Sequence, residues 1–333
     1  MSAPAATPTA IGVATFAVTV DPSRTLTAAV WYPTADATSP TVRYLDVIPG
    51  QAHADAPALA GPRLPVVMMS HGWGGKKEHA AYLAERLAAA GYLVAAVDHG
   101  VDSQATAFLR PRDLSALLDA LADPAKVPAG VAARADLERV AVYGHSFGGF
   151  TALAVGGAAF GPNPQWDAHC ATGEPALDCP APPAGAMPTL EMGDPRVDLV
   201  MAAAPAGYFI FGDAGLGKVA VPSLIIAAGD DDVVPFAQQI APMAAALGAR
   251  NLTVELTDAT HMTFADMCPL IAGKDDAEVG PQCAGTGPLA MGAAHALVGD
   301  LIVAELAHVF ADGPAPEPAA LAAARRVAIT PHR

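Results

Sequence analysis

The sequence predicts an α/β fold in which a mostly parallel central sheet is covered by helices on both faces. Two observations lead to this class. Short, continuously apolar segments typical of buried strands alternate along the chain with segments of helical periodicity. Hydrophobic residues make up 53% of the 333 residues and charged residues only 15%, so there is enough apolar material for one large core. We therefore expect one domain built on one continuous sheet.

The predicted strands and helices follow one another in a regular order. The strands are expected at Thr27–Tyr32, Leu64–Ser70, Tyr92–Asp98, Arg139–Gly144, Asp198–Pro205, Val221–Gly229 and Asn251–Ala259. The helices are expected at Glu78–Ala90, Leu114–Leu121, in a segment that begins at His145, and at Met291–Phe310. Gly91 and Pro124 end the first two helices.

One segment interrupts this alternation. Residues 160–195 are rich in Pro, Ala and Gly and lack both the helix and the strand period, which predicts an insertion after the helix that begins at His145. The insertion is either a partial lid over an active site or a surface loop. We expect residues 1–10 to be a flexible N-terminus, 11–312 to form the domain, and 313–333 to be a C-terminal tail.

The charge balance and the N-terminus restrict partners and location. Asp and Glu number 33 against 18 for Lys and Arg, and the resulting net charge of -15 disfavours nucleic acid and anionic membrane surfaces. No apolar run reaches the length of about 18 residues needed to span a bilayer, so no transmembrane segment is expected. The first ten residues lack the basic and apolar regions of a secretion signal. This predicts a cytosolic protein or one whose signal peptide has been removed, with no indication of oligomeric state.

The four cysteines favour an oxidising compartment. Cys170 and Cys179 bracket a Pro-rich loop, and Cys268 and Cys283 bracket a polar loop, which predicts two disulfides between sequence neighbours. No pair has the spacing of a zinc site or of a redox C-x-x-C, and no metal or other cofactor is expected. Two disulfides indicate a secreted or periplasmic protein; four reduced cysteines would indicate a cytoplasmic one.

Ser146 is the candidate nucleophile. Gly144-His145-Ser146-Phe147-Gly148 matches the pattern G-x-S-x-G, in which the serine sits on a strained strand-to-helix turn and only glycine permits the close backbone packing on either side. The motif falls where a predicted strand ends and a predicted helix begins. The helix N-terminus would then help to stabilise negative charge near the serine.

His261 is the candidate base, because a serine hydroxyl becomes nucleophilic only when a base removes its proton. It lies in a loop after the last predicted strand and before the closing helix. Three other histidines, at strand ends, could line a pocket: His71, His99 and His145. The remaining candidates lie in irregular, helical or terminal segments without such placement: His53, His169, His295, His308 and His332.

The acid that orients the base is expected in the turn Gly229–Pro235. Asp230, Asp231 and Asp232 follow one another there after a predicted strand. The spacing D-x-V-V-P favours Asp231, and Asp232 is the main alternative. The order Ser, Asp, His along the chain is the order found in α/β-hydrolases.

The backbone N–H groups of Trp73 and Phe147 are the candidate donors to the oxyanion of a tetrahedral intermediate. Trp73 lies in the Gly-rich turn HGWGG after a predicted buried strand, and Phe147 follows the nucleophile. A phosphate-binding loop is disfavoured, because no GK[ST] follows the turn and its glycines do not match G-x-G-x-x-G.

Together these segments resemble a known enzyme family. AVWYP, SHGWGG, AERLAAAGYLVAAVDH, the R-x-x-D of Arg110 to Asp113, VYGHSFGG, GDDDVVP and the THM around His261 are similar to the platelet-activating-factor acetylhydrolase and dienelactone-hydrolase-like branch of the α/β-hydrolases, over roughly residues 11 to 310. The resemblance implies the α/β-hydrolase fold and ester hydrolysis through an acyl-enzyme. True dienelactone hydrolases use a cysteine nucleophile, so their substrate is not transferred to this chain.

The sequence therefore predicts a metal-independent carboxylic ester hydrolase, esterase-like or lipase-like, with a small-molecule or polymeric ester as substrate. Ser146, Asp231 and His261 would form the triad. The alternatives are acyl transfer or amide hydrolysis by the same residues, and a catalytically silent binding protein on the same fold.

Overall fold

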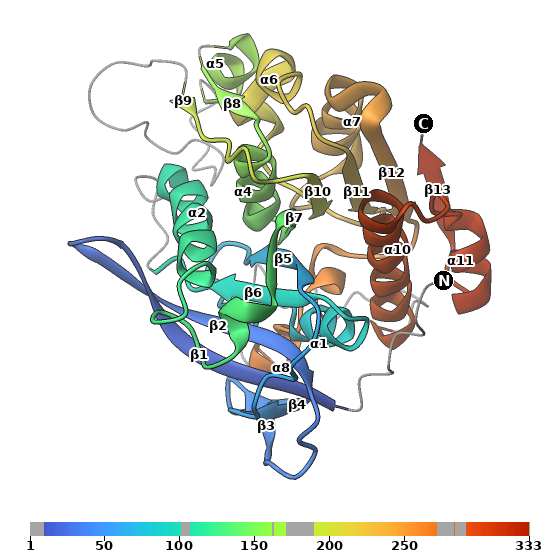
Figure 1. Cartoon of the computed structure of the whole chain (residues 1–333). Coiled ribbons are helices and arrows are strands. Elements are labelled where there is room, and N and C mark those ends of the chain that lie inside the picture. The colour runs from blue at the N-terminus through green and yellow to red at the C-terminus, as the bar shows by residue number, and fades with distance from the viewer. Residues whose placement is uncertain are drawn as a thin grey trace.

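The computed structural model describes residues 10–100, 107–161, 163–170, 190–271, 283 and 291–332, and Figure 1 shows how their helices and strands are arranged. Within these ranges, eleven strands form one sheet in the order β13-β12-β11-β10-β7-β5-β6-β2-β1-β4-β3. The sheet is the scaffold on which the candidate site is built.

The central part of the described sheet is parallel. Its strands are β6 (Leu93–Val97), β5 (Leu64–Ser70), β7 (Ala135–His145), β10 (Leu199–Ala203), β11 (Ser223–Ala228) and β12 (Asn251–Leu256). Each is paired in parallel with its neighbours in this set. Successive residues of β7 alternate between two hydrophobic cores, with Val142 in one and Tyr143 in the other. These pairings confirm the predicted mostly parallel sheet. Its strands contain apolar runs because both faces of the sheet are buried.

The N-terminal part of the sheet contains strands that the sequence did not predict. β1 (Ala10–Asp21) is antiparallel to β2 (Arg24–Thr34), and β2 is antiparallel to β6. β4 (Ile48–Ala54) runs parallel to β1, and β3 (Thr41–Tyr44) lies antiparallel to β4 at the edge of the sheet.

Pro33 was expected to end the first strand, but β2 continues past it. Pro33 is opposite Ile11 of β1, whereas the pairing of β2 with β6 covers only Ala28 to Trp31. The missing N–H of proline therefore breaks no bond to β6, and the strand tolerates the residue.

Helices cover both faces of the sheet (Figure 1). One face carries α2 (Arg110–Leu121), α4 (Phe147–Val155), α6 (Tyr208–Leu216) and α7 (Ala241–Leu247). The other carries α1 (Ala81–Ala89), α10 (Met291–Ala311) and α11 (Pro318–Arg325). Shorter helical segments are η1 (Ala107–Leu109), α3 (Val131–Arg134), η2 (Phe236–Ile240), η3 (Gly248–Arg250), η4 (His261–Phe264) and α8 (Cys268–Ile271).

Helix α10 is long and apolar enough to cross a membrane by length and composition alone. Its residues Leu297, Val298, Leu301 and Ile302 are fully buried in the core on one face of the sheet, and Leu306 continues this buried stripe. About 44% of its most apolar window is buried inside the molecule. Packing against the sheet accounts for the composition of this helix, as in the core helix of a globular domain.

The predicted insertion, residues 160–195, is described only at its two ends. β8 (Ala159–Phe160) pairs antiparallel with β9 (Leu190–Glu191) in a separate two-stranded sheet. α5 (Pro164–Cys170) follows β8. Residues 162 and 171–189 lie outside the described residues, as do residues 1–9 of the predicted N-terminal segment.

The segment 313–333, expected to be a tail, contains α11 and the strand β13 (Ile329–His332). β13 pairs antiparallel with β12 and forms one edge of the sheet. Ala322 and Val327 are buried in the core beside α10, so this segment is part of the domain. The boundary at residue 312 is corrected accordingly.

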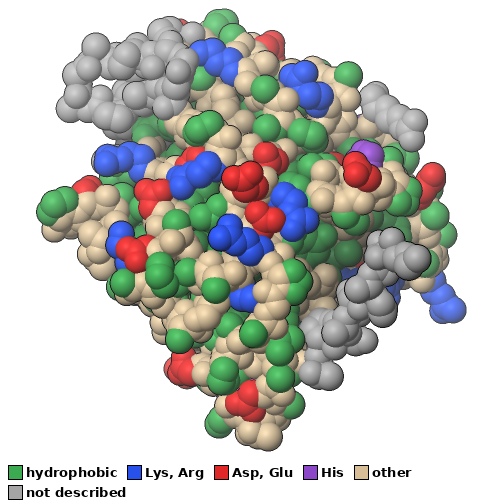
Figure 2. Space-filling view, in the orientation of Figure 1, with side chains coloured by type: hydrophobic (Ala, Val, Ile, Leu, Met, Phe, Trp, Pro, Cys, Tyr) green, Lys and Arg blue, Asp and Glu red, His purple; other side chains and the backbone are tan. Residues whose placement is uncertain are grey.

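Charged side chains of both signs share the surface. On the face shown in Figure 2, the Lys and Arg side chains are interspersed with Asp and Glu side chains and with hydrophobic ones. This face carries no continuous basic patch, in keeping with a chain whose net charge is -15.

Candidate active site

Ser146 occupies a sharp turn between β7 and α4. Its backbone has φ 57° and ψ -122°, a positive φ that is uncommon for any residue except glycine. Its N–H donates to the Ala203 carbonyl at 3.0 Å, and its carbonyl accepts from the Ala206 N–H at 3.1 Å. These bonds to the last residue of β10 and to the segment after it hold the strained turn in place.

The two glycines of the motif are required by close backbone contacts. A Cβ atom on Gly144 would lie 2.0 Å from the Gly148 carbonyl oxygen, and one on Gly148 would lie 2.0 Å from the Ser70 carbonyl oxygen. No side chain can be accommodated at such distances. The steric reason for the G-x-S-x-G spacing is therefore visible in the packing of β7, β5 and α4.

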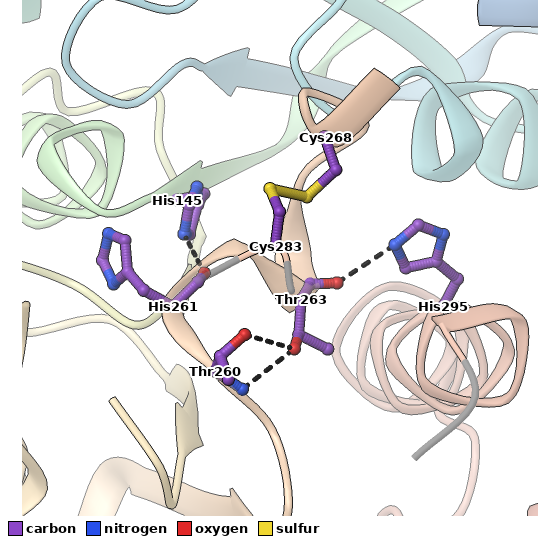
Figure 3. Close-up of a disulfide and its surroundings, with 7 residues drawn as sticks. All are labelled: His145, Thr260, His261, Thr263, Cys268, Cys283 and His295. Atoms are coloured by element: carbon purple, nitrogen blue, oxygen red, sulfur yellow. Dashed lines mark hydrogen bonds between the residues drawn. A yellow bond between two sulfur atoms is a disulfide. The ribbon is translucent and has the colours of Figure 1, made fainter. Parts of the chain in front are cut away.

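His261 begins the short helix η4, which follows β12. Thr260 caps this helix, because its side-chain oxygen receives the Thr263 backbone N–H and the Thr263 hydroxyl receives the Thr260 backbone N–H at 3.0 Å. The His261 carbonyl accepts a hydrogen bond from His145 Nε2 at 2.9 Å (Figure 3). This bond joins the His261 segment to the residue that precedes Ser146, and the two imidazole rings lie 4.8 Å apart.

Asp231 is the aspartate that contacts His261. Its Oδ2 lies 2.7 Å from His261 Nδ1, while its Oδ1 accepts the backbone N–H groups of Val233 at 2.9 Å and Val234 at 2.8 Å. Asp231 is 6% exposed, whereas its two neighbours, Asp230 and Asp232, are exposed. The turn thus orients one carboxylate toward the imidazole and turns the other two outward.

The Asp231 contact also fixes the tautomer of His261. A carboxylate only accepts hydrogen bonds, so Nδ1 carries the proton that faces Asp231. Nε2 is then the ring nitrogen that can take a proton from a serine hydroxyl.

The two candidate oxyanion donors belong to segments that meet at Ser146. A Cβ atom on Gly72 would lie 3.3 Å from Ser146 Cβ, which places the Gly-rich turn directly against the nucleophile. Phe147 is the first residue of α4, so its N–H has no acceptor within the helix. The ring of Trp73 meets the ring of Phe147 edge-to-face, with centroids 5.5 Å apart. The structure thus brings both predicted donor residues together.

A pair of buried histidines supports the His261 segment. His145 Nε2 must donate to the His261 carbonyl, so in neutral His145 the Nδ1 atom accepts the hydrogen bond from His79 Nε2 at 2.7 Å. Burial lowers the pKa of His79 to about 3, and burial together with the nearby His261 lowers the pKa of His145 well below its ordinary value. Both rings are therefore neutral near pH 7.

A second Ser-His-Asp array lies beneath the Gly-rich turn. His99 Nε2 is 2.8 Å from Ser70 Oγ, and His99 Nδ1 is 2.9 Å from Asp113 Oδ2. Arg24 donates to both carboxylate oxygens of Asp113, at 2.8 and 2.6 Å, and to the His99 carbonyl at 2.7 Å. Ser70, His99 and Asp113 are at most 3% exposed. No substrate carbonyl reaches a serine buried so deeply, and the array ties β5 to β6 and α2.

The sequence indicated parts of these arrays without their roles. His71, His99 and His145 stand at predicted strand ends and were named as residues that could line a pocket, and the R-x-x-D of Arg110 to Asp113 belonged to the family resemblance. The contacts of Arg110 and the involvement of His79 were not predicted. His79 carries no local signal, since it precedes a helix and meets His145 only through the fold.

One of the two predicted disulfides is confirmed. Cys268 and Cys283 are bonded, with Cα atoms 5.6 Å apart and a sequence separation of 15, and the bond lies near the His261 segment (Figure 3). The pairing of Cys170 with Cys179 concerns side chains that lie outside the described residues.

Metal-ligand chemistry is not apparent at this site. Among the residues that the structure describes, no group of three or more His, Cys, Asp and Glu side chains is arranged to hold a metal ion.

Comparisons with known proteins place the chain in a fold class. A family model described as serine aminopeptidase, S33 (Hydrolase_4), matches residues 61–192. No curated protein sequence matches the chain. Among solved structures, a ferulic acid esterase from Streptomyces cinnamoneus is similar, with a TM-score of 0.67 and 20% sequence identity over 100% of this chain and 98% of that one. The chain has the α/β-hydrolase fold that the sequence predicted.

Proposed function

We propose that the protein is a carboxylic ester hydrolase in which Ser146, His261 and Asp231 form the catalytic triad. The observation that carries the proposal is the strained turn at Ser146, joined through His145 to a histidine whose Nδ1 lies 2.7 Å from a buried carboxylate. A nucleophile on an elbow, a base and an orienting acid are the parts that acyl transfer through serine needs.

The chemistry proceeds in two half-reactions. Ser146 Oγ attacks the ester carbonyl carbon while His261 Nε2 takes its proton, and Asp231 stabilises the imidazolium that forms. The bond to the alcohol oxygen breaks as His261 returns the proton to that oxygen, leaving the acyl group on Ser146. Water then attacks the acyl carbon while His261 takes its proton, and the bond to Ser146 Oγ breaks as His261 returns that proton to Oγ, which releases the acid and restores the serine.

The backbone N–H groups of Trp73 and Phe147 would stabilise the negative oxygen of each tetrahedral intermediate. Gly72 against Ser146, and the helix N-terminus at Phe147, support this assignment. Removing one such donor costs about 2.7–4 kcal/mol of transition-state stabilisation in known cases.

The substrate class is proposed from two likenesses. The resemblance to the platelet-activating-factor acetylhydrolase and dienelactone-hydrolase-like branch favours small or polymeric esters, and the similar solved structure is a ferulic acid esterase. A panel of p-nitrophenyl esters from acetate to palmitate, an aliphatic polyester and methyl ferulate would rank these classes by kcat/KM.

The proposal is tested by comparing two serine variants. Ser146→Ala is expected to lose at least about 10³-fold in kcat on p-nitrophenyl esters and to lose labelling by a fluorophosphonate, while its thermal unfolding stays close to that of the native protein. Ser70→Ala, in the buried array, is expected to remain labelled. Full activity of Ser146→Ala, or loss of labelling only in Ser70→Ala, would overturn the assignment.

Amide hydrolysis is a second candidate, favoured by the serine aminopeptidase description of the family model over residues 61–192. The same triad would cleave an amide if it can protonate an amine leaving group. Aminoacyl p-nitroanilides offered beside the esters would separate the two activities, and added alcohols or amines would reveal acyl transfer through new products.

We also propose that the protein works in an oxidising compartment, outside the cytoplasm. The Cys268–Cys283 disulfide supports this location, because such bonds persist mainly in secreted and periplasmic proteins. Fractionation of the native host, with detection in the medium or periplasm, tests it.

A further inference from the structure

We propose that His71 and Arg110 are positioning residues, which hold the Gly72–Trp73 peptide with the Trp73 N–H directed toward the oxyanion. The inference rests on the proposed ester hydrolase function and assigns two residues to it. Neither residue would touch the substrate. Both would act through the peptide group that they hold.

The Gly72 carbonyl lies near two side-chain donors, and it also accepts the Gly75 backbone N–H at 3.1 Å within the turn. His71 Nδ1 lies 2.7 Å from the Gly72 oxygen and Arg110 Nη2 lies 3.4 Å from it, while Arg110 Nη1 donates to the His71 carbonyl at 2.7 Å. In a trans peptide the C=O and the following N–H point in opposite directions, and this peptide is trans. Fixing the Gly72 oxygen therefore fixes the direction of the Trp73 N–H.

The protonation state of His71 suits this role. The His99 backbone N–H donates to His71 Nε2 at 3.1 Å, so Nε2 is unprotonated and Nδ1 carries the proton. Burial, with His99 and Arg110 nearby, lowers the pKa of His71 well below its ordinary value. The ring is thus a neutral Nδ1–H donor aimed at the Gly72 oxygen.

Arg110 contacts both arms of the proposed oxyanion hole. Its side chain is fully buried, and its guanidinium lies 5.0 Å from the centroid of the Phe147 ring, which in turn meets the Trp73 ring. The Arg110 side chain therefore binds the carbonyls of His71 and Gly72, which precede the proposed donor Trp73. It also packs on the ring of Phe147, the residue proposed to supply the second donor.

A clamp is needed because the turn is rich in glycine. Gly72, Gly74 and Gly75 surround the Trp73 peptide, and glycine leaves the backbone more freedom to rotate than any other residue. If the peptide rotated, the Gly72 oxygen would face the developing negative charge and the N–H would be lost. Preorganised donors are what make such sites effective, since no reorganisation is then required during the reaction.

The test uses two isosteres of histidine that each keep one of its hydrogen bonds. In His71→Asn the amide nitrogen takes the place of Nδ1 and can donate to the Gly72 oxygen. In His71→Gln the amide takes the place of Nε2 and can accept from the His99 N–H, but the donor to Gly72 is lost. We expect His71→Gln to lose about 10²-fold in kcat with KM within threefold, the size expected for one oxyanion donor, and His71→Asn to lose less than tenfold.

A transition-state analogue separates positioning from general damage to the fold. The affinity for a trifluoromethyl ketone, which forms a tetrahedral oxyanion on Ser146, should fall in His71→Gln by the same factor as kcat/KM, with the pH profile unshifted. Arg110→Met should show the same parallel loss. Arg134→Met is the matched control, because Arg134 is also buried and donates to a backbone carbonyl, that of Pro62, beside the far end of β5. It should lower the thermal midpoint without changing kcat or analogue affinity.

Several outcomes would overturn the inference. These are native kcat and analogue affinity in His71→Gln, an equal loss in His71→Asn, or a fall in kcat without a fall in analogue affinity. If instead the native protein hydrolyses no ester and no fluorophosphonate labels Ser146, the proposed function itself fails. If the His71 variants do not fold, Arg110→Lys takes their place, because it keeps the positive charge but loses the forked donors of arginine. We expect this variant to lose about tenfold in kcat and about tenfold in affinity for the trifluoromethyl ketone.

Discussion

One residue of three neighbouring aspartates makes the contact on which the proposed triad depends. Asp231 is buried and shares its two oxygens between His261 and two backbone N–H groups of its own turn, whereas Asp232 is exposed. The spacing of the sequence favoured Asp231 but kept Asp232 as an alternative. A turn that directs the side chain of one aspartate inward directs the side chains of its two neighbours outward. Which of the three points inward depends on the backbone dihedral angles, and three consecutive aspartates in a sequence do not reveal these angles.

The two aspartates are expected to differ sharply on substitution. Asp231→Ala should lose about 10³- to 10⁴-fold in kcat, because His261 would lose both its orientation and the charge that stabilises the imidazolium. Asp232→Ala should stay within about twofold of the native value. Steady-state kinetics on one p-nitrophenyl ester measures both. Equal losses, or a larger loss at Asp232, would contradict the assignment.

The limits of sequence reasoning are clear at single residues. The candidate Ser146 could be identified from the sequence because its turn demands glycine at fixed spacings, and the candidate His261 because α/β-hydrolases place the base after the last strand. The proposed roles of His71 and Arg110 could not be inferred from the sequence. They depend on which carbonyl each donor meets, and Arg110 lies 38 residues from Gly72 along the chain.

At the scale of elements, the strands that could be predicted from the sequence are those that are buried on both faces of the sheet. The strands β5 and β11 and the buried second half of β7 contain continuous apolar runs and were predicted, since parallel strands between two helix layers need such runs. β13 is four residues long, contains Pro331 and is only partly buried, so nothing in it resembles a core strand. It pairs because it lies at the edge, beside β12.

Helix α6 was missed for a different reason. Most of its residues are apolar, so it shows no amphipathic stripe, and Gly212 interrupts it with a positive φ of 58°. It lies after the strand β10 in a segment where the sequence offers no helix start. Helices buried on several sides give weak periodic signals, and contact with α7 and α5 defines this one.

The segment that carries His261 is tied to the rest of the molecule at several points. The Thr263 carbonyl accepts from His295 of α10 at 3.0 Å, and the disulfide follows at Cys268 (Figure 3). The disulfide closes a loop of about 15 residues, for which the chain-entropy model gives about 3 kcal/mol of stabilisation.

Removing this disulfide should lower stability more than activity. The double variant Cys268→Ser/Cys283→Ser is expected to lose about 3 kcal/mol in free energy of unfolding, measured with urea. Its kcat should stay within about tenfold, because His261 keeps its bonds to Asp231 and His145. An unchanged free energy of unfolding would show that the disulfide does not constrain the unfolded chain. A reductant should lower the free energy of unfolding of the native protein by at least as much as that of the double variant, because only the native protein has the Cys268–Cys283 bond to lose.

At the scale of the whole molecule, several buried polar side chains of the described residues are imidazoles whose pKa is lowered. Among the residues that the structure describes, burial is the largest cause that lowers the pKa of five histidines, to about 3 for His79, to about 4 for His295, and well below the ordinary value for the rest: His71, His99 and His145. Composition shows ten histidines but not which are buried. This property follows only from the way the Gly-rich turn, β7 and η4 pack together.

These histidines make the fold sensitive to acid. In the folded protein they stay neutral, whereas in the unfolded chain each gains a proton as the pH falls below about 6.5. The stabilisation is complete above that pH and is lost as the pH falls toward the folded-state pKa, at about 1.4 kcal/mol per pH unit for each group. Three carboxyls oppose this trend, because burial raises their pKa and they bind protons in the folded state: Asp266, to about 6, Asp113 and Glu305. The histidines outnumber them, so acid should destabilise the protein.

We expect the free energy of unfolding to fall by on the order of 4 kcal/mol between pH 7 and pH 5. Urea unfolding at pH 7, 6 and 5 measures it. His79→Gln keeps a donor in place of Nε2 and removes one titrating group, so its stability should fall less steeply, by about 1.4 kcal/mol per pH unit. Two results would contradict this expectation: a free energy of unfolding of the native protein that does not change over this pH range, or a pH dependence of His79→Gln equal to that of the native protein. Either would mean that the buried imidazoles are protonated in the folded state and that their neutral hydrogen-bond network is wrongly assigned.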